Sequence, residues 1–434
     1  MRRISLFPQA THVDRNNHLV VGGCDAVALG AEFGTPLYVF DEATLRGKCA
    51  EFREEFASRY RDSLVVYACK AFINRALAQV FKEEGLGLDV ASGGELSVAR
   101  SVDFPMERVH FNGNSKSQSE LRLAVECGVG RVVVDNFHEL SLLSTVAAEG
   151  GVRQGILLRL SPGVDPHTHA YIATGVVDSK FGFPMAQAEE AVAQAMSSSS
   201  LELKGLHFHI GSQLLEFEPY RKAIAIVLRL AVEMRREHGF ALTELSTGGG
   251  LGITYSEDSP APTVAEFAQA IVTSLEEEAG ALGIEPPRLV VEPGRSIVGQ
   301  AGVAVYTVGS TKDIPGVRRY VSVDGGMADN IRPALYQARY EAVVANRVQG
   351  DDSELVTIAG KFCESGDILI RDIELPRIEP GDIIAVPCCG AYCLAMASHY
   401  NAALSPAVVL VKDGKARLIR RRQSYDDLMS HDLI

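Results

Sequence analysis

The sequence predicts an α/β protein with a (β/α)8 TIM barrel and a C-terminal antiparallel β domain that also takes in the N-terminal strands. From residue 64 to about 295, a short apolar run and an amphipathic stretch alternate eight times, which suits a closed barrel of roughly 250 residues. After residue 300, strand-like runs follow one another between Pro-Gly, Gly-Asp and Asp-Gly turns, a pattern typical of antiparallel sheet. We therefore predict a barrel domain at residues 43–300 and a β domain at residues 1–42 and 301–434.

The barrel strands are expected where apolar and β-branched residues form short runs. These runs are Leu64–Ala68, Leu86–Val90, Arg108–Phe111, Arg131–Val134, Ile156–Leu160, Lys204–Ile210, Glu244–Thr247 and Arg288–Val291. The intervening helices are expected at Asn74–Glu84, Gly94–Ser101, Ser117–Cys127, His138–Glu149, Ala186–Ser197, Glu218–His238 and Val264–Leu282. Strands that alternate with helices require a parallel sheet with right-handed crossovers.

Polar, reactive residues follow nearly every barrel strand. They are Lys70, Asp89, Asn112, Asn114, Asp135, Arg159, His209, Gly248–Gly250, Glu292 and Arg295. An open doubly wound sheet is the structural alternative, and it would bind its ligand at a single switch point. A closed barrel instead brings all eight strand ends to one rim, where such enzymes keep their active site. The barrel therefore explains the distribution of these residues better.

The β domain is predicted from runs that are short and rich in valine and isoleucine. They are Val303–Val308, Tyr320–Val323, Leu355–Ile358, Ile383–Val386, Ala407–Val411 and Ala416–Arg420. The N-terminal segments HLVVGG and TPLYVFD look similar, and we expect them to join this domain.

Composition excludes several classes of protein. A net charge of −13 argues against a general nucleic-acid binder. No run approaches the ~18 apolar residues of a membrane span, and the N-terminus lacks the apolar core of a signal peptide, so we expect a cytoplasmic protein. Eight scattered cysteines do not form a disulfide framework in that compartment. The cluster Cys388, Cys389 and Cys393 has no second pair at zinc-site spacing, so no metal site is expected.

Lys70 ends a buried-looking strand in the segment YACKAF. A lysine at such a position either extends to water or serves as a reactive amine. Three other motifs bear on this choice. In HFHIGSQ, His209 is either a core residue or a flat ring stacked on a ligand, and Ser212 follows it. In STGGGLGI, Gly248–Gly250 form either a tight turn or a backbone anion site that suits a phosphate.

The segment VVEPGRS supplies a carboxylate and a guanidinium at the last strand end. Glu292 and Arg295 could pair with each other. With a lysine and a phosphate site at the same rim, we instead expect Glu292 to face a pyridinium nitrogen and Arg295 to hold an anion. A lysine amine, a phosphate site, a stacking histidine and a carboxylate together indicate a pyridoxal 5′-phosphate site.

The chain resembles the fold-type III pyridoxal-phosphate decarboxylases, the group related to alanine racemase and ornithine decarboxylase, and within it most closely the diaminopimelate decarboxylases. The resemblance extends from Thr35 to Asn401. Its motifs, in order, are YACKAF, GLDVASGGEL, HFNGNSKS, SPGVDPHTHAYIATG with SKFGF, HFHIGSQ, STGGGLGI, EPGRSIVG, VDGGMADNIRPALY, CESGD and GAYCLAMASHYN.

The resemblance implies a role for each matching residue. Lys70 would be the Schiff-base lysine, His209 would stack on the ring, and Glu292 would partner its nitrogen. Asp89 and Glu95 would support Lys70 and His209. The cofactor-binding set it implies is Lys70, Asp89, His209, Ser212, Gly249, Gly250, Glu292, Gly294, Arg295 and Tyr392. The substrate-binding set is Arg295, Arg332, Tyr336, Glu364 and Tyr392, and the catalytic set is Lys70, His209 and Cys363, with Cys363 as the proton donor to Cα.

The resemblance also implies a homodimer, in which Cys363 and Glu364 reach the site of the other subunit, and a reaction that converts meso-diaminopimelate to L-lysine and CO2. The distal end of that substrate carries both charges, so Arg332 for its carboxylate and Glu364 for its ammonium have the required opposite signs. Three alternatives stay open: a decarboxylase for another amino acid or a carboxylated polyamine precursor, a cofactor carrier without activity, and an alanine-racemase-like activity.

Overall fold

The structure is a computed structural model that describes residues 3–165, 179–350 and 352–434. Internal contacts divide the chain into two compact units. The first, here called the barrel unit, consists of Cys49–Gly252 and Ala261–Gly294. The second, the β unit, consists of the residues up to Lys48 together with Ile253–Pro260 and Arg295–Ile434.

The barrel unit contains a closed parallel barrel. Its strands are β5 (Ser63–Ala68), β6 (Gly87–Val90), β7 (Val109–Phe111), β8 (Arg131–Val134), β9 (Gln154–Ser161), β11 (Leu201–Phe208), β12 (Glu244–Ser246) and β13 (Arg288–Val291). Neighbours pair in the order β9-β11-β12-β13-β5-β6-β7-β8, and β8 also pairs with β9, which closes the ring. The short β10 (Phe183–Pro184) extends beside β9. The predicted TIM barrel is confirmed, and the open sheet is excluded.

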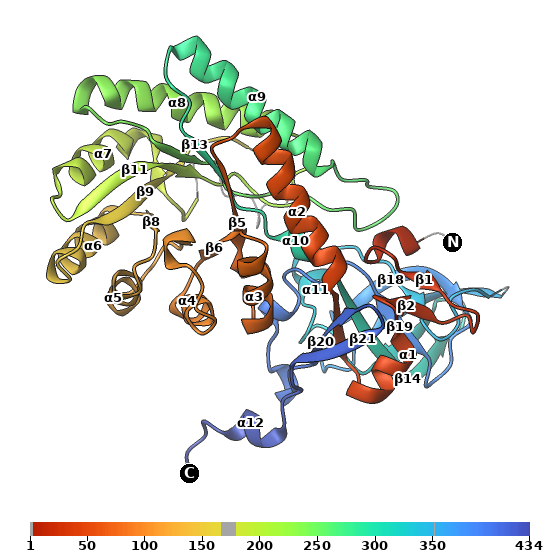
Figure 1. Ribbon diagram of the computed structural model, residues 1–434. Coiled ribbons are helices and arrows are strands. Elements are labelled where there is room, and N and C mark those ends of the chain that lie inside the picture. Colours follow the sequence, from red (N-terminus) through yellow and green to blue (C-terminus); the bar gives the residue numbers. More distant parts are fainter. Residues whose placement is uncertain (1–2, 166–178, 351) are drawn as a thin grey trace. The chain divides into compact units, whose positions relative to one another are not determined.

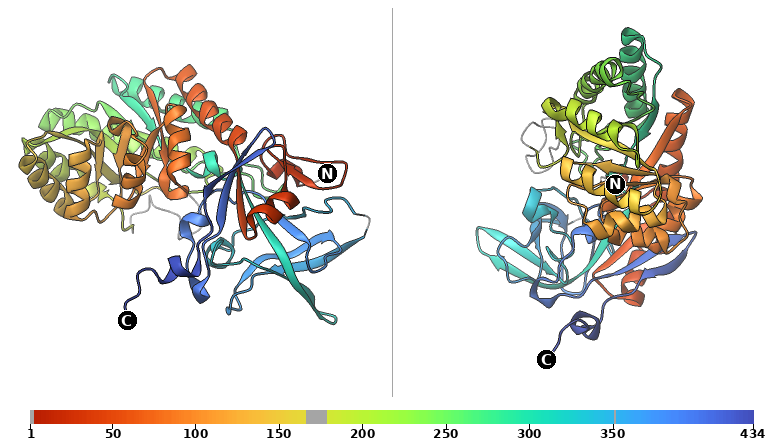
Figure 2. Two further views of the ribbon diagram at one scale, coloured as in Figure 1. Left: turned by 60° about the horizontal axis from the view of Figure 1, so that its bottom comes forward. Right: turned by 90° about the vertical axis from the view of Figure 1, so that its left-hand side faces the viewer.

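Helices surround the barrel on its outside (Figure 1). They are α3 (Arg75–Glu83), α4 (Gly93–Arg100), α5 (Gln118–Cys127), α6 (Phe137–Glu149), α7 (Ala188–Ser197), α8 (Glu218–His238) and α9 (Val264–Leu282), and Figure 2 shows them from two further directions. Local capping fixes several ends: Ser117 with Glu120 and Thr263 with Glu266 form capping boxes, and Gly128 ends α5 in the left-handed region. None of the helices in the described ranges has the length and apolar content to cross a membrane.

The β unit is built mainly from antiparallel pairs. Its larger sheet joins β18 (Ile368–Pro376), β17 (Ser353–Ala359), β15 (Arg318–Val323), β14 (Gly302–Ile314), β4 (Leu37–Asp41), β20 (Ala407–Lys412) and β21 (Lys415–Arg420). Strand β19 (Ile383–Val386) also pairs with β14, and β16 (Val343–Val344) pairs with β19. Two pairs, β15–β17 and β20–β4, are parallel. As expected, the N-terminal segment TPLYVFD joins this sheet as β4. The other N-terminal strands, β1 (His12–Val13), β2 (Leu19–Val21) and β3 (Cys24–Asp25), form a sheet of their own.

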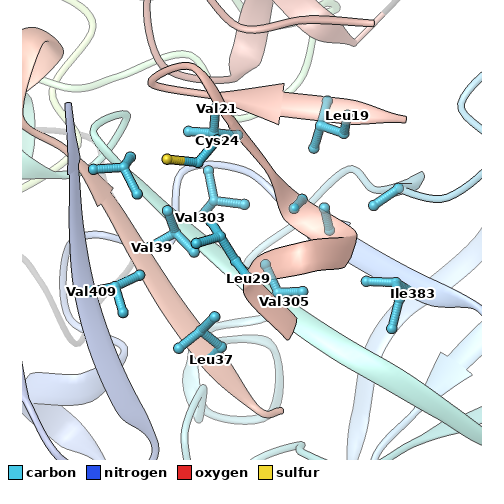
Figure 3. Packing of buried hydrophobic residues seen from close by; sticks show 14 of the residues in the cluster. Leu19, Val21, Cys24, Leu29, Leu37, Val39, Val303, Val305, Ile383 and Val409 are labelled. Carbon is cyan, nitrogen blue, oxygen red and sulfur yellow. The ribbon is translucent and has the colours of Figure 1, made fainter. Parts of the chain in front are cut away.

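An apolar core holds the N-terminal segments of the β unit against its sheet (Figure 3). Leu19 and Leu37 are fully buried in it, together with Val303, Val305 and Val409. Short helices complete the unit: α1 (Ala26–Phe33), α10 (Arg295–Val298), α11 (Arg332–Tyr336) and α12 (Tyr425–Met429). A further helix, α2 (Glu42–Arg59), begins in the β unit and ends in the barrel unit. Neither α1 nor α2 was among the predicted elements.

Candidate active site

Four of the predicted residues lie at the carboxyl ends of neighbouring barrel strands. Lys70 lies in a single 3-10 turn, η2 (Cys69–Ala71), directly after β5, and its side chain is exposed. Asp89 lies near the end of β6, at the level of Ala68 in β5. His209 follows β11 and Glu292 follows β13, which pairs directly with β5. The closed barrel thus brings these side chains to one rim, as the strand-end pattern predicted.

Glu292 is a buried carboxylate that the barrel keeps ionised. The Ser246 hydroxyl donates to its Oε1 at 2.7 Å, and His207 Nε2 lies 3.1 Å from its Oε2. Burial alone would raise the pKa of Glu292, but the interactions with His207 and the hydrogen bond from Ser246 lower it well below the usual range, while burial lowers the pKa of His207. Each carboxylate oxygen still has a second lone pair for a further donor.

His209 presents a neutral imidazole. The backbone N–H of Gly249 donates to His209 Nδ1 at 3.2 Å, so the ring proton resides on Nε2. Burial and the positive charge of Lys70 lower the pKa of His209 well below its ordinary value. A neutral, flat ring fixed by a backbone donor suits stacking against an aromatic ligand.

Asp89 and Glu95 both interact electrostatically with Lys70, whose charge acts to lower the pKa of each carboxyl. Asn112 donates to Asp89 Oδ1 at 2.8 Å, and the backbone N–H of Ala91 donates to Glu95 Oε2 at 2.7 Å. Burial and the charge of Glu292 raise the pKa of Asp89 to about 8, although Lys70 and Asn112 act in the opposite direction. Burial also raises the pKa of Glu95. These two carboxyls therefore form the acidic surroundings of the lysine.

The glycines of STGGGLGI are required by the packing of the chain itself. A Cβ on Gly249 would lie 2.0 Å from the carbonyl oxygen of Glu292. Gly250 has a φ of +120°, and a Cβ there would lie 2.6 Å from the Gly211 carbonyl, next to Ser212. Gly294 packs more loosely, with Ala68 at 3.1 Å from an added Cβ. The predicted phosphate loop is thus a tight turn in contact with the loop of Ser212.

In the β unit, two arginines converge on one tyrosine. Arg295 Nη1 donates to the hydroxyl of Tyr255 at 2.6 Å, and Arg332 Nη1 donates to the same oxygen at 2.8 Å. Arg332 also donates to the hydroxyl of Tyr340, whose oxygen lies 3.6 Å from Cys393 Sγ. Both arginines are 6% exposed. Burial opposes the charge of Arg332, but the two phenols and the thiol raise its pKa above the usual value.

Tyr392 and Tyr336 belong to the same unit. The Arg295 guanidinium lies over the Tyr392 ring, 4.8 Å from its centroid. Tyr392 has a φ of +60°, which is unusual for an aromatic residue and fixes the direction of its side chain. Tyr336 ends α11, one helical turn after Arg332.

Cys363 and Glu364 lie on an exposed loop of the β unit. The backbone N–H of Cys363 donates to Asn401 Oδ1 at 2.9 Å, and the hydroxyl of Tyr400 donates to its carbonyl at 2.9 Å. Asp367 anchors the loop by accepting from the N–H of Phe362 at 2.9 Å. The backbone of the loop is therefore fixed, and the N–H of Gly366 also donates to Glu364 Oε1 at 3.2 Å, while both Cys363 and Glu364 remain exposed.

Sequence reasoning missed four residues in these clusters. His207 lies two positions before His209, near the end of β11. Because side chains two positions apart on a strand point to the same face, the period-two alternation could have identified His207. Ser246 begins the STGGGLGI motif. Tyr255 and Tyr340 had no motif or periodicity to mark them. Of the motif SPGVDPHTHAYIATG, residues 166–175 lie outside the described residues.

Comparisons with known proteins agree with this geometry. The family model of the pyridoxal-dependent decarboxylases, pyridoxal binding domain, matches residues 42–299. A diaminopimelate decarboxylase of Bacillus subtilis is 47% identical over 422 residues, which cover 97% of this chain and 96% of that protein. The chain belongs to the diaminopimelate decarboxylase family.

Other relatives in the diaminopimelate decarboxylase family match over similar lengths. The Synechocystis protein is 44% identical over 99% of this chain and 93% of its own length. A crystal structure of diaminopimelate decarboxylase from M. jannaschii in co-complex with L-lysine has a TM-score of 0.92 and 35% identity, with 98% of each chain covered. Since the family is pyridoxal-dependent, the cofactor is pyridoxal 5′-phosphate.

The barrel rim fits this cofactor of the diaminopimelate decarboxylase family. The deciding observation is the buried carboxylate of Glu292, which His207 and Ser246 keep ionised while each oxygen retains acceptor capacity. A protonated ring nitrogen is the partner that such a carboxylate needs. The neutral ring of His209 and the exposed amine of Lys70 add a stacking surface and a group that reacts with an aldehyde.

Proposed function

We propose that the protein catalyses the decarboxylation of meso-2,6-diaminopimelate to L-lysine and CO2, the last step of lysine biosynthesis. The observation that carries the proposal is the environment of Arg332. In residues 3–165, 179–350 and 352–434, the side chains that bond to Arg332 are phenols and no carboxylate pairs with it. A buried cation requires an anion. The distal carboxylate of diaminopimelate would supply it.

The barrel residues prepare the cofactor for bond cleavage at Cα. When bound, pyridoxal 5′-phosphate accepts the electron pair released as the bond between Cα and the substrate carboxylate breaks. Glu292 would keep a proton on the ring nitrogen, and His209 would hold the ring by stacking. Lys70 would provide the amine that binds the aldehyde. Ser212, Gly249, Gly250 and Gly294, with Arg295 and Tyr392, would bind the phosphate and its surroundings, and Asp89 would orient Lys70.

The β-unit residues select the substrate. Arg295, Arg332 and Tyr336 would bind the distal carboxylate, with Tyr392 beside them. Glu364 would bind the distal ammonium, and Cys363 would return a proton to Cα after CO2 has left. A site built to bind an ionic group keeps an unpaired buried charge when the ligand lacks that group. A substrate without the distal carboxylate would therefore be rejected strongly.

We further propose a homodimer in the cytoplasm. Cys363 and Glu364 lie on an exposed loop, as expected if this loop completes the active site of a second copy. All eight cysteines lie in the described ranges and none forms a disulfide, in keeping with a reducing compartment. Sedimentation of the holoenzyme would test the dimer: a monomer with full activity would contradict it.

Decarboxylation of meso-diaminopimelate, measured beside its LL isomer and L-lysine, tests the proposed reaction. We expect CO2 and L-lysine in equal amounts from the meso isomer and at least ~10³-fold lower kcat/KM for L-lysine. Preference for another amino acid or for a carboxylated polyamine precursor would overturn the substrate assignment. Absence of CO2 release from every substrate would overturn the activity.

A further inference from the structure

The hydroxyl of Tyr255 is the point at which both arginines of the β unit meet. Arg295 and Arg332 each direct Nη1 to this oxygen, at 2.6 and 2.8 Å. A phenol oxygen has two lone pairs, so it can accept both bonds at once. The two guanidinium groups, which carry like charges, are thereby held together by one neutral atom.

The ring of Tyr255 is fixed as well as its hydroxyl. It packs edge-on against Tyr340, with ring centroids 5.4 Å apart and an interplanar angle of 81°. The Arg332 guanidinium lies over the Tyr255 ring at 4.8 Å and the Arg295 guanidinium at 5.8 Å from its centroid. These contacts hold the ring of Tyr255 against Tyr340 and both guanidinium groups, at the point where the arginines converge.

The arrangement leaves one edge of Arg332 for a ligand. Both of its hydrogen bonds to tyrosine use Nη1. Within the described part of the chain, no acceptor bonds to its Nη2. A guanidinium has five N–H donors, so a carboxylate can bind this edge while Tyr255 keeps its own bond.

We propose that Tyr255 is a specificity-determining positioning residue, whose hydroxyl holds Arg295 and Arg332 in the converging geometry that receives the distal carboxylate of the substrate. This inference rests on the proposed function, because it assumes that the arginines bind that carboxylate. Without the hydroxyl, the two like charges separate and only one guanidinium at a time reaches the carboxylate. A ligand without a distal carboxylate does not use this geometry.

The substitution Tyr255→Phe tests the inference, since it keeps the ring and removes only the shared acceptor. We expect KM for meso-diaminopimelate to rise about tenfold or more, with kcat within about twofold and the visible absorbance of the bound cofactor unchanged. Tyr320→Phe is the matched control, because Arg318 lies over that ring at 5.9 Å in another part of the sheet. Unchanged kinetics in Tyr255→Phe, or an equal fall in kcat and absorbance, would overturn the inference.

A binding measurement separates failure of this inference from failure of the proposed function. Calorimetric titration of the holoenzyme with pimelate, a seven-carbon dicarboxylate, requires no turnover. We expect Tyr255→Phe to weaken pimelate binding about tenfold and to leave binding of L-lysine within twofold. An equal loss of affinity for both ligands, or no change in either affinity, would overturn the role of Tyr255. Failure of the wild-type holoenzyme to release CO2 from meso-diaminopimelate would instead overturn the proposed function.

Tyr340→Phe provides a second variant, because this tyrosine accepts from Arg332 and not from both arginines. We expect a smaller rise in KM than in Tyr255→Phe, since the shared acceptor remains. A larger rise in Tyr340→Phe would overturn the view that the bridge between the arginines is the important feature.

Discussion

The barrel rim and the pair Arg295 and Arg332 of the β unit differ in how their buried charges are stabilised. In the barrel unit, Glu292 is bonded by His207 and Ser246, and the buried Lys116 lies 2.7 Å from Glu139. In the described part of the β unit, the neighbours that raise the pKa of the buried Arg332 are the phenols of Tyr255 and Tyr340 and the thiol of Cys393. Because an unpaired buried charge is costly, it matters that side chains of the barrel itself stabilise Glu292, whereas Arg332 lacks an anionic partner among the described residues.

The difference indicates a division of labour. A compensated carboxylate suits a cofactor that stays bound, because its charge is already fixed before the ligand arrives. An arginine without a carboxylate partner suits a substrate that binds and leaves, because each binding event supplies the missing charge. Substrate choice is therefore expected to reside in the β unit and cofactor chemistry in the barrel unit.

The largest effect is expected at Lys70. Lys70→Ala removes the amine that we propose binds the cofactor aldehyde, so CO2 release from meso-diaminopimelate should fall by about 10⁴-fold or more. The visible absorbance of the bound cofactor should disappear as well. Lys204→Ala, in which a surface lysine 2.6 Å from Glu202 is removed, is the control and should retain both. Turnover that survives in Lys70→Ala would contradict the assignment of the barrel rim.

The next largest effect is expected at Cys363. Cys363→Ala should lower kcat about 10²-fold, because the proposed general acid is lost, while the cofactor absorbance stays at the wild-type level. We expect the rate and the cofactor absorbance to respond separately, since Cys363 belongs to the β unit. Cys127→Ala, at the end of α5, should leave the rate unchanged. A rate for Cys363→Ala equal to that of the wild type would remove its role as proton donor.

A smaller effect is expected at His207. His207→Ala removes a contact that lowers the pKa of Glu292. The effect of burial would then raise this pKa, so Glu292 would become protonated at a higher pH than in the wild type. The acid limb of kcat/KM should therefore move up by about one pH unit. His207→Gln, which restores a donor, should reverse part of this shift, and His238→Gln on the surface should cause none. Identical pH profiles for His207→Ala and the wild type would show that His207 does not act on Glu292.

The smallest effect concerns Asp89, a rim carboxyl whose charged form is disfavoured by burial. Its pKa is raised to about 8, so between about pH 4 and 8 the folded, cofactor-free chain holds a proton that the unfolded chain has released. The stability of the wild type should fall as pH rises through this window. Asp89→Asn removes this dependence, so its Tm relative to the wild type should rise by a few °C from pH 5 to pH 8. Asp62→Asn, at an exposed position, should show no such trend.

The fold could be predicted where periodicity was strong. Strands β8 and β13 and helices α8 and α9 have the predicted bounds, because each repeats its apolar pattern over its whole length. Helix α2 was missed because its many charged residues, in EATLRGKCAEFREEFASR, conceal the apolar positions. Strand β18 was missed because its pairing with β17 shifts register twice, which interrupts the alternation.

Only those site residues could be predicted that follow a barrel strand or belong to a recognisable motif. Lys70, His209 and Glu292 follow barrel strands, and the closed barrel brings such positions together whatever their separation in sequence. Tyr255 lies in a loop, 40 residues before Arg295 and 77 before Arg332. No pattern in the sequence relates a loop tyrosine to two distant arginines, so only the folded β unit reveals that they meet.

The most direct test of this division of labour is the substitution Arg332→Gln, assayed with meso-diaminopimelate and with L-lysine in the holoenzyme. The two-region account predicts wild-type cofactor absorbance, a fall of about 10²-fold or more in kcat/KM for meso-diaminopimelate, and an unchanged low rate with L-lysine. Loss of the cofactor, or an equal fall for both substrates, would contradict it.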